Sequence, residues 1–260
     1  MVVSGYLDES EDDDWFTLGA LFSTGAEWTW LEVDWTRCLE RWNKKLITEG
    51  RPPITRFHAS DCWQRNNEFD GWSREEGERF REELRGILAD TGGMHAVSLS
   101  LRPCELAEVF EVKTPKRIKR GCYQVLLQYL MMEIGVTVSK ANNPRVTVPL
   151  IHDRTKHYDK SIERSFFELK DSPGFRYSRY YTTIVPMSWE QCVALQPADM
   201  IAYECRKQVR NVAQGFPLGG DLLKIMDLPS FGGTGRYFRK DNLEHLKQVL
   251  DEVNHKLTEI

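Results

Sequence analysis

The sequence lacks several features that would assign it to a class of proteins. Its six cysteines are dispersed and include no CxxC pair, which argues against a zinc site and fits reduced thiols better than a disulfide framework. No segment approaches the roughly 18 consecutive apolar residues that a membrane span needs. Net charge is also small, because 35 Lys and Arg stand against 39 Asp and Glu. A strongly basic nucleic-acid binder is therefore not indicated, although net charge says little about local patches.

The N-terminus reaches acidic residues within eight positions and lacks the basic-then-apolar pattern of a secretory signal. What is present is an apolar fraction of 41%, with 12 Phe and 8 Trp, which is ample for a core. We find no internal repeat and no convincing linker in the sequence. Composition therefore predicts a soluble, cytoplasmic protein with no membrane partner, folded as one domain over residues 1–260.

Hydrophobic periodicity predicts that strands and helices alternate. Strands are expected at 2–8, 15–23, 95–101, 145–152 and 180–187, and helices at 28–46, 73–90, 121–138, 158–169, 196–211 and 241–257. Ser73 followed by Glu76 predicts a capping box, residues 9–14 an acidic hairpin turn, and the Gly- and Pro-rich residues 215–235 a loop. This order is typical of an α/β fold with a mixed sheet flanked by helices.

Three aspartates stand at the boundaries of predicted elements. Asp8 closes the first strand, Asp153 closes the strand at 145–152, and Asp199 lies in the opening turn of the helix at 196–211. A carboxylate beside a core is costly unless something compensates its charge. Hard divalent cations such as Mg²⁺ or Mn²⁺ favour carboxylate ligands. The three residues therefore predict an acidic metal site.

Each aspartate also has a simpler interpretation. Asp8 could begin the hairpin turn, Asp153 could cap the helix that follows it, and Asp199 could be only a favourable charge at a helix N-terminus. Glu9 follows Asp8, so in a regular strand the two side chains point to opposite faces. Glu9 is therefore either a further metal ligand or a residue that supports the site from behind or from the turn.

The helix at 196–211 carries further candidates. Pro197 is expected at its first position, and Gln196 shares a face with Asp199. Gln196 could orient Asp199 or a metal-bound water. Ala198 and Ala202, beside that face, predict close packing of the helix on a sheet.

His58 and Asp61 are three residues apart and face the same way if the segment is helical. They could supply a proton-transfer group and an additional metal-binding carboxylate. Alternatively, His58 is a packed or capping histidine and Asp61 is a simple helix cap.

Two stretches combine features that nucleic acid can use. Residues 113–120 are rich in Lys and Arg and precede a helix, and residues 176–181 interleave Arg with Tyr. Phosphate contacts and base stacking are the means by which proteins bind single strands. Arg154, Lys156 and His157, next to Asp153, could also contact phosphate. Charge runs are equally compatible with a solvated surface.

The order of the acidic residues resembles that of the ribonuclease H-like fold, in which metal-binding acids converge from distant segments. A closer resemblance is to the DUF3800 family. Its short motifs are matched here, in order, by Asp8-Glu9 within residues 6–10, by Phe57-His58-Ala59-Ser60-Asp61, by Asp153, and by Gln196-Pro197-Ala198-Asp199. The resemblance runs from about residue 2 to residue 206 and implies a ribonuclease H-like domain with nuclease-like chemistry.

We therefore expect a divalent-metal-dependent nuclease that hydrolyses phosphodiester bonds of DNA or RNA, with Asp8, Asp153 and Asp199 as ligands. In a two-metal site, one ion activates a water and the other stabilises the leaving oxygen. The alternative is a non-catalytic ribonuclease H-like module for binding or signalling. A glycosidase fits less well, because it needs two acids at a fixed separation.

Overall fold

In the computed structural model, which describes residues 1–141, 143, 145–154, 158–217 and 231–248, six strands form one mixed sheet in the order β5-β4-β1-β2-β3-β6. The strands are β1 (Val3–Glu11), β2 (Phe16–Thr24), β3 (Met94–Leu101), β4 (Val148–Asp153), β5 (Tyr181–Met187) and β6 (Phe231–Phe238). β1, β2 and β3 are antiparallel to one another in turn, whereas β4 is parallel to β1, β5 to β4, and β6 to β3. The predicted mixed sheet is confirmed.

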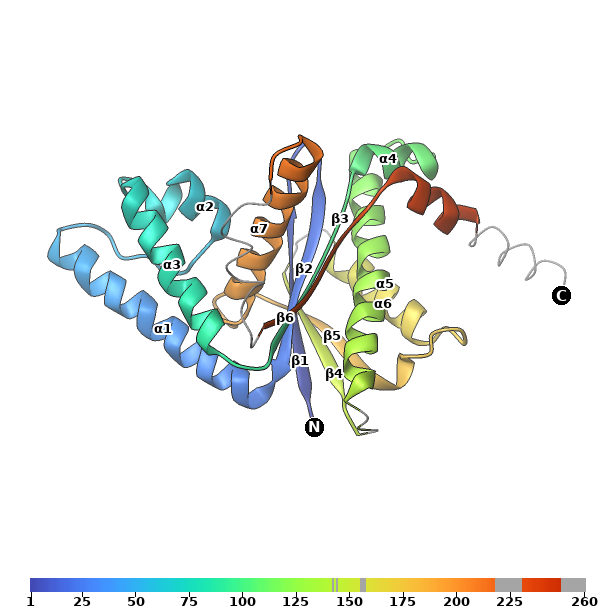
Figure 1. Ribbon diagram of the computed structural model, residues 1–260, viewed down its shortest axis with the longest axis horizontal. Helices are drawn as coiled ribbons and strands as arrows, with labels where there is room; N and C mark the ends of the chain where they lie inside the picture. The colour runs from blue at the N-terminus through green and yellow to red at the C-terminus, as the bar shows by residue number, and fades with distance from the viewer. Residues whose placement is uncertain (142, 144, 155–157, 218–230, 249–260) are drawn as a thin grey trace, which may run out of the picture.

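Helices lie on both sides of the sheet (Figure 1). One side carries α1 (Gly25–Thr48), α2 (Ala59–Gln64), α3 (Arg74–Asp90) and α7 (Leu195–Ala213), and the other carries α4 (Pro103–Val109), α5 (Pro115–Lys140) and α6 (Asp159–Lys170). Two 3₁₀ turns, η1 (Asn67–Phe69) and η2 (Ser178–Tyr180), and a helical segment at 240–248 complete the described part. The protein is thus a three-layer α/β/α arrangement.

Each face of the sheet buries its own hydrophobic core. On the α5 side, Leu7 and Leu18 pack with Leu126 and its neighbours. On the α1 side, the core is rich in aromatic residues, with Trp35 of α1 and Phe80 of α3 among them. Because β2 lies between both cores, it is buried at every position from Phe16 to Ser23. The nearly unbroken apolar sequence of β2 follows from this double coverage.

Most predicted elements are present, and their local signals explain them. Ser73 accepts a hydrogen bond from the Glu76 N–H while the Glu76 carboxylate accepts one from the Ser73 N–H, so the predicted capping box of α3 is confirmed. The apolar positions predicted for the helix at 28–46 are the buried face of α1. All six cysteines are free thiols. No described helix is long and apolar enough to cross a membrane.

The hairpin turn lies later than predicted. β1 continues through Glu9 to Glu11 and pairs with β2 along its length, so residues 9–11 belong to the strand. The turn is formed instead around Asp12, whose Oδ1 accepts the N–H groups of Asp14 and Trp15. Asp12 also forms an ion pair with Arg206 of α7. Polar composition suggested an earlier turn, but pairing with β2 and this ion pair extend the strand.

The helix predicted at 121–138 begins six residues earlier, at Pro115. Pro115 occupies the first turn of α5, where its missing N–H costs nothing. The basic stretch at 113–120 therefore does not precede the helix but forms its first turns, and Lys119 pairs there with Glu11.

The predicted loop at 215–235 is wrong where β6 begins at Phe231, and residues 218–230 lie outside the described part. β6 pairs with β3 over its whole length. One of the glycines that suggested a loop, Gly232, fits this edge strand, because a Cβ atom there would lie 2.3 Å from His95 Nδ1. Of the final helix predicted at 241–257, the described part includes residues up to 248, and these are helical.

Candidate functional site

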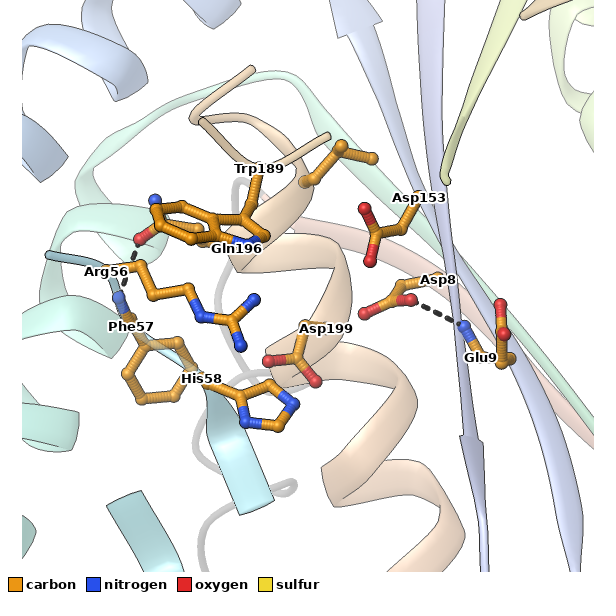
Figure 2. A pocket seen from close by; sticks show the side chains of 10 residues that line it. Asp8, Glu9, Arg56, Phe57, His58, Asp153, Trp189, Gln196 and Asp199 are labelled. Atoms are coloured by element: carbon orange, nitrogen blue, oxygen red, sulfur yellow. Dashed lines mark hydrogen bonds between the residues drawn. The ribbon is translucent and has the colours of Figure 1, made fainter. Parts of the chain in front are cut away.

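Asp8, Asp153 and Asp199 line one pocket, together with His58, Arg56 and five other residues. The pocket has a volume of about 190 Å³. Figure 2 shows the three aspartate side chains pointing into a common space from β1, β4 and α7. Three segments that are far apart in sequence are therefore brought together, as the two strand-end acids and the one helix-start acid predicted.

The sheet places two of the three aspartates. β1 and β4 are parallel neighbours, with Leu7 paired to His152, so the next residue on each strand, Asp8 and Asp153, projects from the same face. Asp8 is paired with Gly19 in mid-strand, which excludes the interpretation as a turn residue. Asp153 does not cap α6 either, because that helix begins at Asp159 after Tyr158.

Close packing of α7 on the sheet determines the position of the third aspartate, Asp199. A Cβ atom at Gly19 would lie 2.8 Å from the Cα of Ala202, and both Ala198 and Ala202 are fully buried. The prediction of close packing at these alanines is confirmed. Asp199, less than one turn from Ala202, is thereby held opposite Asp8.

The start of α7 differs from the prediction. The helix begins at Leu195 rather than at Pro197, so Asp199 lies beyond the first turn. A turn at residues 192–195 leads directly into the helix, and Pro197 is tolerated because the first-turn N–H groups have no partner within the helix. The interaction of Asp199 with the helix dipole is correspondingly weaker than expected.

The carboxyl groups of the pocket resist ionisation. Burial raises the pKa of Asp8 well above its ordinary range, and the neighbouring carboxylates, Asp199 foremost, raise it further. Burial also raises the pKa of Asp199, an effect that His58 and Arg56 partly oppose. The pKa of Asp153 is raised by burial as well. Buried acids that repel one another are a common property of functional sites.

His58 and Asp199 lie on adjoining walls of the pocket (Figure 2). The N–H of Ala59 donates to Asp199 Oδ2 at 2.7 Å, which ties the start of α2 to α7. His58 Nδ1 lies 2.8 Å from Asp61 Oδ2. Asp61 does not line the pocket; it also accepts a hydrogen bond from Asn67 Nδ2. Asp61 therefore supports His58 from behind rather than joining the other carboxylates.

Gln196 lines the pocket, but its carbonyl oxygen is engaged elsewhere. Oε1 accepts hydrogen bonds from Trp35 Nε1 at 3.0 Å and from the Phe57 N–H at 2.9 Å. Both bonds are buried. Gln196 thus fixes the segment that carries His58 to α1 and α7, and this contact differs from the predicted contact with Asp199.

Glu9 also lines the pocket, but because it follows Asp8 in β1 its side chain projects from the other face of the strand. Its backbone N–H donates to Asp8 Oδ1 at 2.9 Å, while its side chain points away from the three aspartates (Figure 2). Burial raises the pKa of Glu9 to about 7, against the opposing charge of Lys119. Glu9 therefore orients Asp8 through its backbone.

Arg56 and Trp189 also line the pocket, and sequence reasoning missed both. The Arg56 guanidinium lies over the Trp189 ring, 4.6 Å from its centre. Arg56 directly precedes Phe57 and Trp189 follows β5, but neither position has a signal in composition or periodicity that could have identified it.

The other candidate nucleic-acid contacts lie elsewhere. Tyr177, Tyr180 and Tyr181 are buried in the core on the α5 side, so their rings are not available for base stacking. The basic residues of α5 lie on the side of the sheet opposite to α7 (Figure 1). Arg154 is exposed and is not part of the pocket lining, and Lys156 and His157 lie outside the described residues.

The pocket presents carboxylate oxygens, the donors that hard divalent cations prefer. In the part of the chain that the structure describes, no three His, Cys, Asp or Glu side chains form a group that could hold a metal ion as they stand. The donor chemistry nevertheless suits a hard divalent cation, because three carboxylates with raised pKa values face one pocket. No protein-family model matches the chain, and no curated protein matches it either.

Proposed function

We propose that the protein is a divalent-metal-dependent nuclease that hydrolyses phosphodiester bonds of DNA or RNA. The observation that carries this proposal is the convergence of Asp8, Asp153 and Asp199 on one pocket. A pocket whose acids repel one another has a strong electrostatic demand for cations. Phosphoryl transfer is the reaction class in which carboxylate-held cations are most directly useful.

Asp8, Asp153 and Asp199 would hold Mg²⁺ or Mn²⁺. When bound, such ions activate a water and stabilise the leaving oxygen of a phosphodiester. Asp8 and Asp153 come from neighbouring strands and Asp199 from a helix packed tightly on them. The acids therefore sit on rigid elements, which is what a precise site needs.

His58 is the candidate for proton transfer. Its Nδ1 is engaged by Asp61, so Nε2 is the atom left to exchange a proton with a group in the pocket. A carboxylate behind an imidazole fixes its tautomer and orientation, as in other acid–base sites. Asp61 is a positioning residue in this scheme.

The order of the strands is an argument for the ribonuclease H-like fold that this proposal includes. An antiparallel series β1-β2-β3 is followed by β4 and β5, which add in parallel on the other side of β1. The acids lie on the first strand, at the end of the fourth and on a late helix. This is the placement that the motif order implied.

The test is cleavage of labelled single-stranded, double-stranded and hybrid substrates with Mg²⁺, Mn²⁺ or EDTA. We expect metal-dependent cleavage that is lost in Asp199→Asn and retained in Asp13→Asn, since Asp13 is an exposed turn residue. The melting temperature of the wild type should rise with Mg²⁺, through binding to the folded state, and that of Asp199→Asn should rise less. Absence of both cleavage and a metal-dependent shift would contradict the proposal and favour a non-catalytic binding module.

A further inference from the structure

Arg56 places a cation in the wall of an otherwise acidic pocket. Figure 2 shows its guanidinium beside Trp189 and directed toward Asp199 and His58. The charge of Arg56 lowers the pKa of both Asp153 and Asp199, against the larger effect of burial. The positive charge of Arg56 therefore acts in the same pocket that the carboxylates line.

The backbone around Arg56 is held firmly. The Arg56 N–H points to Glu68 Oε2 at 3.4 Å, and the N–H of the next residue, Phe57, donates to Gln196 Oε1. The side chain rests on Trp189. A stacked guanidinium is pre-organised, because the ring restricts its orientation while leaving its N–H edge open.

The N–H edge itself has no protein partner among the described residues. Within residues 1–141, 143, 145–154, 158–217 and 231–248, the guanidinium forms no ion pair within 4.0 Å and no hydrogen bond. Arg51, five residues earlier in the chain, is by contrast paired with Glu76. Arg56 is thus half-buried, oriented and free to bind an anion.

We propose that Arg56, held by Trp189, is the group that binds the non-bridging oxygens of the substrate's phosphate. This inference rests on the proposed nuclease function for the class of substrate. The planar fork of arginine matches phosphate oxygens in a bidentate manner. Arg56 and the carboxylates lie on different walls, so a phosphate between them would meet the guanidinium on one side.

The size of the pocket indicates the form of the substrate. A volume of about 190 Å³ is below the roughly 300–1,000 Å³ of typical small-molecule pockets. The pocket therefore accepts one phosphoryl group with little of its surroundings. A flexible single strand, or a strand end, can insert one phosphate in this way more easily than a rigid duplex.

Arg56 has one competing role, which is only to balance the charge of the aspartates. The two roles differ in what they predict for substrate binding. A charge-balancing arginine would affect stability and metal affinity, but would not change the number of phosphate contacts made by a bound strand.

The experiment measures the affinity of a short fluorescein-labelled single-stranded oligonucleotide by anisotropy, with Ca²⁺ in place of Mg²⁺ and over a range of salt concentrations. The variants are Arg56→Gln, Arg56→Lys and Trp189→Ala. Arg37→Gln is the matched control, because Arg37 is exposed on α1 and does not line the pocket. Circular dichroism and melting temperatures establish that each variant is folded.

We expect Arg56→Gln to weaken binding about ten-fold or more, as for the loss of a charge-assisted hydrogen bond. The slope of log affinity against log salt should fall in magnitude by about 0.7, the value for one phosphate contact on a single strand. Arg56→Lys and Trp189→Ala should show smaller losses, and Arg37→Gln none. The wild type should bind the single strand more tightly than the matching duplex.

An Arg56→Gln variant with wild-type affinity and salt slope would overturn the inference, as would a wild type that binds no strand. Cleavage by the wild type separates this result from the proposed function. If the wild type cleaves but Arg56→Gln binds the strand normally, the proposed nuclease function is retained and the proposed role of Arg56 is refuted. If binding of the strand depends on Arg56 but no substrate is cleaved, the nuclease proposal is refuted and the phosphate-binding site at Arg56 is retained.

Discussion

Asp8 is surrounded by charges of its own sign. Burial and the nearby carboxylates raise its pKa well above the ordinary value, so ionising Asp8 costs more free energy in the folded state than in the unfolded chain. Functional sites often retain such unfavourable groups, and their removal commonly stabilises a protein while abolishing activity. Replacing Asp8 should therefore raise the stability of the protein and lower its activity.

We expect Asp8→Asn to raise the stability of the metal-free protein at neutral pH by roughly 0.5–2 kcal/mol and to abolish cleavage. The folded-state pKa of Asp8 is raised, so its contribution to stability is present below the unfolded pKa and is lost as the pH rises through the folded pKa. The gain should therefore shrink as the pH falls toward about 4. Chemical denaturation at several pH values measures it, with Asp13→Asn as the exposed control. A less stable variant at neutral pH would contradict this expectation.

Gln196 shows how a residue can line a site and yet serve the fold. Its Oε1 accepts two buried hydrogen bonds, from Trp35 and from the backbone of Phe57. Removing this acceptor leaves both donors unpaired in the core, and each buried unpaired group costs about 1–3 kcal/mol.

We expect Gln196→Met to lower the free energy of unfolding by about 2 kcal/mol or more. Gln214→Met, at an exposed position just after α7, should have little effect. Trp35→Phe should lower the free energy of unfolding less in the Gln196→Met background than in the wild type, because the acceptor of the Trp35 hydrogen bond is already absent there. Urea denaturation of the four variants checks this, and additive costs would refute the shared contact.

Contacts between elements set the geometry of the pocket. The packing of α7 on β2 has no room for a side chain at Gly19, and α7 carries both Gln196 and Asp199. The site therefore depends on one helix–sheet contact in which glycine and alanine permit close approach. The alanines signalled this contact in the sequence, whereas Gly19 within an apolar strand gave only a general hint of close backbone approach.

We expect Gly19→Ala to cost about 1–3 kcal/mol, the range for overpacking a core, and to reduce cleavage by displacing Asp199. Gly86→Ala is the matched control within α3, where nothing lies within 4 Å of the added Cβ. That control should stabilise the protein by about 0.5–1 kcal/mol. Thermal denaturation and the cleavage assay compare the two variants. If Gly19→Ala and Gly86→Ala had the same stability and activity, the contact between α7 and β2 at Gly19 would not be tight.

Across the whole molecule, the two cores share a single sheet. Leu126 lies in the core on the α5 side, and no tryptophan belongs to that cluster of buried residues, whereas the cluster on the α1 side includes Trp28, Trp35 and Trp42. Because β2 is buried by both cores, loss of packing on one side should be transmitted to the other. Tryptophan fluorescence then reports on a face that is remote from the change.

We expect Leu126→Ala to lower stability by about 2–5 kcal/mol, as for other large-to-small core changes, and to shift the tryptophan fluorescence and circular dichroism transitions together. Met132→Ala, at an exposed position on the same helix, should leave both transitions nearly unchanged. Separate transitions for the two signals would show that the cores unfold independently.

Much of the fold was predictable because its signals are local. The spacing of aromatic residues predicted α1, the Ser73 and Glu76 pair predicted the start of α3, and apolar runs predicted β2 and β4. The acids Asp8, Asp153 and Asp199 were identified by their positions at the boundaries of predicted elements, two at strand ends and one at the start of a helix. Each of these inferences needs only neighbouring residues, because periodicity and caps act within a few turns of the chain.

Other features were decided by the tertiary structure alone. Residues 231–238, which were predicted to be a loop up to residue 235, form a strand because they pair with β3. The hairpin turn lies at Asp12, later than predicted, where Asp12 forms an ion pair with Arg206. Asp61 was placed behind His58, and Arg56 was brought into the pocket with Trp189. Strand pairing, ion pairs between elements and the walls of a cavity join residues that are far apart in the sequence, as Asp12 and Arg206 are. The amino-acid sequence thus determined most of the segments that form elements and which acids could act, and packing in three dimensions determined which side chains meet and that β6 is a strand.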